Sequence, residues 1–310
     1  MLVIVGASGK LGFATLTSLL DHQLLASSQI AVTSSSTSGS SKLQPFTSQG
    51  VTLHNANWDD PITHWTSVFK NADAIFLISS ARIQKDFHDA SPGHGREADH
   101  FRALEGAKAA GVKHVYYTSL AFANPSKSCV MTAHERTEAY LAEHWAGHFT
   151  IIREGLYSES WPLYFGHWDL QSDRNRSEVI TAGGGKISWT SIADLGLANA
   201  LILAAPRDEW KGRTVYLSQK QALSLAEVAK VVSEAKGSEV AFREVSRDEH
   251  EHFYAKERGM DEGLVTWWSK TYAALMDGEC EINDSTLEDL LASKGVKPKP
   301  MEKTIHEMLR

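Results

Sequence analysis

Leu2-Val3-Ile4-Val5 is an unbroken apolar run, and Gly6-Ala7-Ser8-Gly9-Lys10-Leu11-Gly12 follows it directly. A strand that is apolar on both faces is typical of a parallel sheet covered by helices. The glycine run then opens a segment, from Ala14 to Leu20, whose apolar residues recur at helical spacing. The fold is therefore predicted to begin with a buried strand, a tight turn and a helix.

The G-x-x-G-x-x-G spacing of this turn predicts a dinucleotide-binding loop. Its glycines allow a tight turn, a close approach of backbone to a pyrophosphate, and close packing of helix on strand. The N-terminus of the following helix would direct free N–H groups and a positive dipole at the phosphates. Any tight strand-to-helix turn also selects glycine, so a purely structural loop is the alternative.

Composition excludes several classes of protein. The chain has 310 residues, of which 42% are hydrophobic, and a net charge of −7. The charge argues against direct nucleic-acid binding, and no apolar stretch has the roughly 18 residues of a membrane span. Two cysteines, Cys129 and Cys280, cannot make a disulfide framework. No signal peptide is expected, and we expect a cytoplasmic protein.

Strand-like and helix-like segments alternate along the first two thirds of the chain, which predicts a doubly wound parallel α/β sheet of the Rossmann type. A Rossmann domain is expected over 1–155, completed by 187–218, with a smaller, mostly helical domain from 156–186 and 219–310. Glycines 183–185 are expected to form a hairpin turn. Further strands are expected at 29–33, 51–54, 74–78, 112–118, 149–153 and 214–218, and helices at about 59–70 (with Pro61 just inside), 96–110, 132–145, 191–204 and 224–234.

The end of the second strand decides which nucleotide such a unit prefers. It usually carries an acid for a ribose hydroxyl or a base for a 2′-phosphate. Here a Ser-rich run begins at Ser34 and Ser35 and reaches Lys42. These hydroxyls and the lysine favour NADP(H) over NAD(H). A flexible surface loop is the alternative interpretation.

Other strands predict further site residues, because strand C-terminal ends face the ligand crevice in this architecture. Ser79 and Ser80 end the fourth expected strand, and Thr118, Ser119 and Leu120 end the fifth. Asn57 follows the third. His88 and His94 lack partners with metal-ligand spacing, so no metal site is expected.

The segment after the sixth strand is rich in aromatic residues. Tyr157, Trp161 and Trp168 follow it, and Phe122 lies just after the fifth strand. These rings are candidates for the wall of a pocket for a flat substrate. Ordinary core packing explains the pattern equally well.

The motifs together resemble the NmrA-like family of atypical short-chain dehydrogenases/reductases, which includes quinone oxidoreductases and triphenylmethane reductases. The resemblance runs from Leu2 to about Tyr216. It rests on four segments in order: VGASGKLG at 5–12, FLISS at 76–80, GAKAAGVKHVYYTSL at 106–120 and REGLYSES at 153–160.

The resemblance implies an NADP(H)-binding Rossmann domain, a smaller domain, a small aromatic or quinone substrate in the cleft between them, and a possible homodimer. Quinone reductases of the family carry an arginine where this chain has about Ser35, which leaves NADP(H) preference open. By analogy, cofactor contacts fall on the glycine loop, on Leu77, Ile78, Ser79 and Ser80, on Thr118, Ser119 and Leu120, and on Glu154, Gly155, Leu156, Tyr157, Ser158 and Glu159.

The chain departs from ordinary short-chain dehydrogenases, which use a Tyr-x-x-x-Lys pair on the helix after the fifth strand. The one such spacing, Tyr216 to Lys220, lies far downstream and is a chance match. The expected helix offers His134 instead, as a proton donor or as part of a solvated face.

We therefore predict hydride transfer from a reduced nicotinamide to a quinone. Ser119 or Tyr157 would hydrogen-bond the developing oxyanion, and His134 would supply a proton. Two alternatives remain: a regulator that senses the dinucleotide and signals to a protein partner without turnover, and a tailoring reductase or isomerase of aromatic metabolites.

Overall fold

One parallel sheet organises the chain. The computed structural model describes residues 1–310 apart from the side chain of Ser38. Its seven strands run in the order β3-β2-β1-β4-β5-β6-β9 and all pair in parallel. This doubly wound arrangement confirms the predicted Rossmann fold. The strands are β1 (Leu2–Val5), β2 (Ile30–Ser34), β3 (Thr52–Asn55), β4 (Ala74–Leu77), β5 (His114–Leu120), β6 (Phe149–Glu154) and β9 (Thr214–Leu217).

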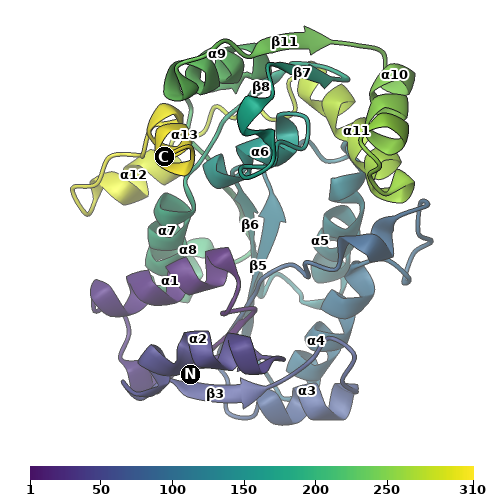
Figure 1. Cartoon of the computed structure of the whole chain (residues 1–310). Helices are drawn as coiled ribbons and strands as arrows, with labels where there is room; N and C mark the ends of the chain where they lie inside the picture. The colour runs from purple at the N-terminus through teal and green to yellow at the C-terminus, as the bar shows by residue number, and fades with distance from the viewer.

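Helices cover both faces of the sheet (Figure 1). This explains why all four residues of β1 are buried. Helices α1 and α7 lie on one face, and α3, α4 and α5 on the other. The helices of this part are α1 (Lys10–Asp21), α2 (Thr37–Thr47), α3 (Ile62–Val68), α4 (Glu97–Ala109), α5 (Thr132–His144), α7 (Ile192–Ala204) and α8 (Arg207–Trp210).

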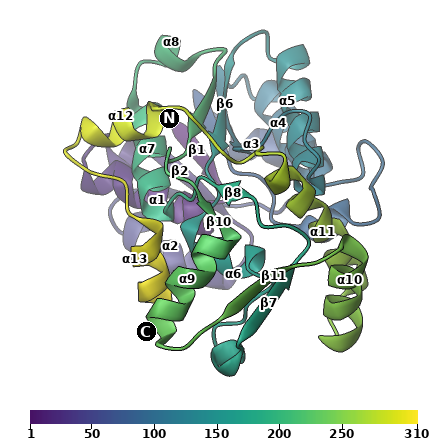
Figure 2. The same ribbon diagram turned by 90° about the horizontal axis from the view of Figure 1, so that it is seen from above.

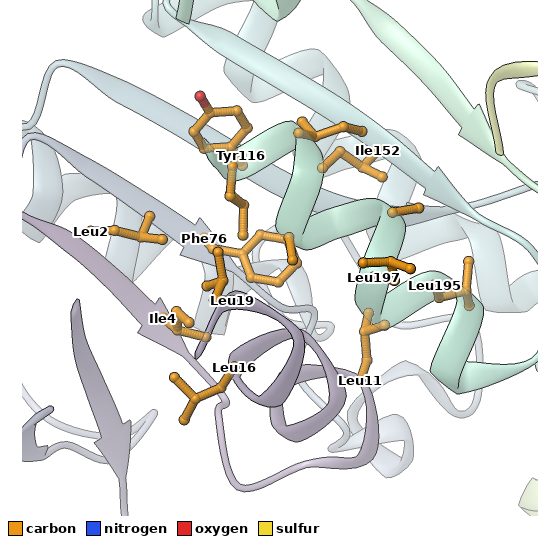
Figure 3. Close-up of a cluster of buried hydrophobic side chains, with 14 of the residues drawn as sticks. Leu2, Ile4, Leu11, Leu16, Leu19, Phe76, Tyr116, Ile152, Leu195 and Leu197 are labelled. Atoms are coloured by element: carbon orange, nitrogen blue, oxygen red, sulfur yellow. The ribbon is translucent and has the colours of Figure 1, made fainter. Parts of the chain in front are cut away.

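The core on the α1 and α7 face is a single cluster of apolar side chains (Figure 3). Ile4 and Phe76 project from the sheet toward Leu16 and Leu19 of α1. The two helices approach closely because α7 has a glycine at the contact: a Cβ on Gly196 would lie 2.7 Å from the Cβ of Ala14. The glycine loop before α1 is thereby fixed by packing on two sides.

The rest of the chain gathers at the end of the sheet toward which β6 points (Figure 1). Two short sheets lie there, β7 with β11 in parallel and β8 with β10 antiparallel. Helix α13 packs on α9, whereas α12 returns to α7 (Figure 2). The elements are α6 (Trp161–Tyr164), β7 (Glu178–Thr181), β8 (Lys186–Ile187), β10 (Leu223–Ser224), α9 (Leu225–Lys236), β11 (Ala241–Glu244), α10 (Arg247–His252), α11 (Glu262–Met276), α12 (Thr286–Ala292) and α13 (Met301–Met308).

Two local predictions around the second and third strands are wrong. The Ser-rich run is not a loop, because α2 begins within it at Thr37. The hydroxyl of Ser36 accepts a hydrogen bond from the Gly39 amide at 3.0 Å, so this serine is a helix N-cap. Pro61 precedes α3 and does not lie inside it, and the Asp60 carboxylate turns back to accept from the Asn57 amide at 2.7 Å.

The expected hairpin at the three consecutive glycines is also wrong. The flanking strands β7 and β8 pair with β11 and β10 and not with each other. A Cβ on Gly185 would overlap the carbonyl of Leu275 in α11, and one on Gly183 would lie 2.8 Å from Met276. The glycines are there because the chain passes against a helix.

Candidate active site

The glycine loop is held by its own backbone and by β2. Gly6 has φ +87°, a conformation that favours glycine. Its amide donates to Thr33 Oγ1 at 3.3 Å, and the Gly9 amide donates to the Gly6 carbonyl at 3.0 Å. A Cβ on Gly12 would lie 2.5 Å from that carbonyl oxygen and 2.7 Å from Ile78 Cδ1. The third glycine therefore allows the helix to pack on the strands.

A cavity of about 410 Å³ lies over this loop at the ends of β1, β2 and β4. The N-cap of α1 is Gly9, so no side chain covers the amides of its first turn, and they are oriented toward the loop as a phosphate requires. Predicted cofactor residues that line the cavity are Gly6, Ser8, Gly9, Lys10, Leu11, Gly12, Ser34, Ser35, Ile78, Ser79 and Tyr157.

Several lining residues were not predicted. Trp58 packs on Trp65 with ring centroids 5.7 Å apart, and both lie in the cavity wall with Val5, Thr33, Ala56 and Ala81. Asn57, which was predicted, instead makes a local turn in which its Oδ1 accepts from the Asp59 amide. The strand end indicated this region but not which side chain faces inward.

Predicted residues behind the cavity hold its floor in place. Thr118 Oγ1 accepts from the Ser79 amide at 3.0 Å, and the Ser80 hydroxyl donates to Asp99 at 2.8 Å. His100 Nε2 accepts from the Ser80 amide at 2.9 Å. Burial lowers the pKa of His100 to about 3, so the ring is neutral and can accept. Ala7 and Leu77 are buried in the core.

The predicted phosphate corner contains one cation. Lys42 Nζ donates to the Ser8 carbonyl at 3.0 Å and lies 4.5 Å from the centroid of the Phe13 ring. Ser35 lines the cavity beside it. The lysine thus bridges α2 and the glycine loop, next to the hydroxyl-rich end of β2.

A second cavity of about 210 Å³ adjoins the first, and Tyr157 lines both. Its walls are largely apolar and come from segments far apart in the sequence. They are Ile83, Leu120, Val130, Gly155, Leu156, Tyr157, Ser160, Leu163, Tyr164, Leu264, Trp267 and Trp268.

Of the four residues predicted for the aromatic wall, only Tyr157 lines this cavity. Phe122, Trp161 and Trp168 do not line this cavity but lie in the core of the C-terminal part, each 4% exposed or less. Their place is taken by Trp267 and Trp268 of α11. No local pattern marks those two residues, because only the tertiary packing of α11 brings them to the end of β6.

The Tyr157 hydroxyl is a free donor at the junction of the two cavities. It has no hydrogen-bond partner within the described part of the chain. Burial raises the pKa of Tyr157 well above its usual value, as do the nearby charges of Glu154 and Glu159. The phenol therefore keeps its proton and can donate to an oxyanion.

The other two predicted catalytic residues do not line either cavity. The Ser119 hydroxyl donates to Glu138 at 2.6 Å, and Arg153 pairs with the same carboxylate at 2.7 Å. His134 is 2% exposed, with Nδ1 3.0 Å from the Tyr117 hydroxyl. The solvated helix face expected there is wrong, and burial lowers the pKa of His134 well below its usual value.

The remaining predicted contacts close the end of β6. The Glu154 carboxyl accepts from Asn199 Nδ2 at 2.8 Å, and Glu159 accepts from the Ile192 amide at the start of α7. Ser158 is buried and bonds through its amide to the Thr190 carbonyl at 2.9 Å. These residues support the segment that carries Tyr157.

No three metal-ligating side chains lie together among the described residues. No helix that the structure describes is both long enough and apolar enough to cross a membrane.

Comparison with known proteins adds independent information. No family model matches the chain. The NmrA-like family domain-containing oxidoreductase flvB of Aspergillus flavus is 28% identical over 306 residues, covering 96% of this chain and 92% of that protein. Quinone oxidoreductase 2 of Escherichia coli is 27% identical over 297 residues, covering 94% and 93%.

Solved structures have the same fold over the whole chain. The NADPH-dependent quinone oxidoreductase of E. coli, solved with NADPH, has a TM-score of 0.80 at 26% identity, with 100% of both chains covered. The triphenylmethane reductase of Citrobacter sp., solved with NADP(H), has a TM-score of 0.82 at 23% identity, again over 100% of both chains. Over nearly its whole length the chain is thus similar to an NmrA-like family oxidoreductase and to a quinone oxidoreductase, in agreement with the resemblance of its sequence motifs.

Proposed function

We propose that the protein is an NAD(P)H-dependent oxidoreductase, using NADP(H), that reduces a quinone or a similar flat aromatic acceptor. The relatives named as oxidoreductases and the neighbour solved with NADPH support the reaction class and the cofactor. The acceptor is argued from the second cavity.

The observation that carries the proposal is the position of Tyr157, which lines both cavities. Hydride transfer requires donor and acceptor in direct contact and aligned. The long cavity over the glycine loop fits a dinucleotide, and the apolar one fits a flat ring. The two ligands would meet at Tyr157.

The chemistry required of the protein is modest. A bound reduced nicotinamide supplies hydride, and a quinone that receives it becomes a stabilised phenolate. The protonated Tyr157 phenol can donate a hydrogen bond to that oxygen. The walls from Trp267 and Trp268 exclude water and orient the ring.

The experiment is NADPH oxidation against a panel of quinones, with equilibrium NADPH binding measured in parallel. Turnover that saturates with at least one quinone is expected. Tight stoichiometric binding without turnover would favour the sensing regulator. Absence of nucleotide binding would reject both.

A further inference from the structure

Arg153 and Glu154 are consecutive on β6, but their side chains differ in whether a group of opposite charge lies beside them. Arg153 pairs with Glu138 of α5 at 2.7 Å, so both charges are compensated. The Glu154 side chain lies on the α7 side, where Asn199 Nδ2 donates to its Oε1 at 2.8 Å. Its Oε2 has no hydrogen-bond partner among the residues that the structure describes. The Glu138 carboxylate is thus part of an ion pair, whereas the Glu154 carboxyl has no cationic partner among the described residues.

The surroundings of Glu154 are apolar. It is 1% exposed, and its neighbours in the sheet register are Leu120 of β5 and Leu217 of β9. Burial raises its pKa from 4.5 to about 8, against a small lowering by Asn199. At pH 7 the carboxyl is therefore mostly protonated.

Glu154 lines neither cavity, but it directly precedes the segment at which the two cavities join. Gly155, the next residue, lines the acceptor cavity, and Tyr157 lines both. When Glu154 is ionised its charge acts on Tyr157, since it helps raise the pKa of that phenol. A charge that appears at the junction during the reaction would act on Glu154 in turn.

We propose that Glu154 is a redox-linked proton site, which holds a proton while the bound nicotinamide is neutral and releases it when the ring becomes cationic. The inference rests on the proposed function. Glu154 acts through electrostatics at the junction, so it is a positioning residue and not the group that reacts.

The charges and atoms balance. The hydride carries two electrons from the reduced nicotinamide to the acceptor, which leaves a positive ring and a negative acceptor oxygen. The O–H bond of the Glu154 carboxyl breaks, and the carboxylate that remains compensates the ring. The Glu154 proton goes to the solvent and the acceptor oxygen takes one proton from the solvent, so the net number of protons in solution is unchanged by this pair of steps. Exchange of the oxidised nucleotide for the reduced one restores the proton.

The other polar groups around Glu154 do not compensate its charge. From α7 it faces the neutral Asn199 amide, and along its own segment it interacts electrostatically with the phenol of Tyr157, on which the Glu159 carboxylate also acts. On the opposite face of β6, Arg153 is engaged by Glu138. A cationic ring would be the first positive charge at this carboxyl among the groups described.

The test is calorimetric binding of NADP⁺ and of NADPH to the protein at pH 7, in two buffers of different ionisation enthalpy. We expect NADP⁺ to release more protons on binding than NADPH does, by up to one proton per nucleotide, because Glu154 is mostly protonated before binding. Ionisation of the 2′-phosphate cancels in this difference. The excess release should decline above pH 8 as the free carboxyl ionises.

Three variants make the result specific. Glu154→Gln should abolish the excess release while both nucleotides still bind. Asn199→Leu should move its pH midpoint upward, because the Asn199 hydrogen bond lowers the pKa of Glu154. Glu159→Gln, which removes the other carboxylate near Tyr157, should retain it.

Excess release that persists in Glu154→Gln, or equal release with both nucleotides in the native protein, would overturn the inference. The proposed function would survive either result. Failure to bind any nucleotide would instead reject the function itself.

Discussion

At the scale of single residues, the second and third glycines of the motif are under different constraints. A Cβ on Gly12 would lie 2.5 Å from the Gly6 carbonyl oxygen, and the neighbouring contacts include backbone atoms that cannot move aside. A Cβ on Gly9 would lie 3.2 Å from the same oxygen, and Gly9 is exposed toward the cavity. Close packing therefore constrains Gly12, whereas Gly9 lies at the wall of the cavity.

We therefore predict that Gly12→Ala lowers the free energy of unfolding by about 1–3 kcal/mol, as overpacking does. Gly9→Leu should cost less stability but abolish NADPH binding, since its side chain would fill the phosphate cradle. Urea denaturation and a fluorescence titration with NADPH measure the two effects. Unchanged nucleotide affinity in Gly9→Leu would refute the dinucleotide cradle.

Glu154 should also set how stability depends on pH. Its pKa is about 8 in the folded protein against 4.5 as reference, so the folded state binds more protons between these values. Stability is then lost as the pH rises from about 4.5 to about 8, and the loss reaches about 3 kcal/mol at pH 7. Glu154→Gln should flatten this slope in urea denaturation at pH 5 and pH 8. An unchanged slope would show that the carboxyl titrates normally.

The partners of buried polar side chains are the hardest feature to predict from sequence. His134 has the same helix spacing whether it faces solvent or the core, and only its contact with Tyr117 distinguishes the two. Ser119 follows the expected strand end, but its hydroxyl turns to Glu138 on a helix 19 positions later. The end of a strand predicts the region of the fold in which a residue lies, whereas the partner of its side chain depends on which helix packs there.

At the scale of elements, sequence patterns predicted helices and strands most reliably where one local signal was sufficient to identify the element. The apolar run of β1 and the capping box of α9 (Ser224 with Glu227) needed no tertiary information. The serines after β2 were ambiguous because serine favours both loops and helix N-caps. The structure resolves this in favour of α2, whose N-terminus lies beside the predicted phosphate corner.

That corner predicts how nucleotide choice can be changed. Ser35 lines the cavity, and Lys42 lies against the glycine loop. Ser35→Asp would place a carboxylate near a 2′-phosphate, where like charges repel, and would offer an acceptor to a free 2′-hydroxyl. We expect NADPH affinity to fall by about tenfold or more, while NADH affinity is retained or rises. Ser35→Asn is the neutral control of equal size. Parallel losses for both nucleotides would place the 2′-phosphate elsewhere.

At the scale of the whole molecule, the parallel sheet and the positions of its strands could be predicted because each strand and crossover has a local signature. The acceptor cavity could not, since its walls come from positions as distant as Ile83, Val130 and Trp267. The aromatic segment after β6 was correctly seen as unusual. Yet most of its rings are buried in the core that supports α11, and only Tyr157 and Tyr164 line the cavity.

Because the two cavities are lined largely by different residues, we predict that binding of the nucleotide and binding of the acceptor can be weakened separately. Trp58 lines only the dinucleotide cavity, and Trp267 lines the acceptor cavity from α11. Trp58→Ala should weaken NADPH binding by about 1–3 kcal/mol through lost stacking, with little effect on the KM for the quinone at saturating NADPH. Trp267→Ala should raise that KM about tenfold or more and leave NADPH affinity unchanged. Each variant is the control for the other. If Trp267→Ala altered NADPH affinity and spared the quinone KM, the acceptor would have to bind outside the cavity that α11 and the end of β6 form together.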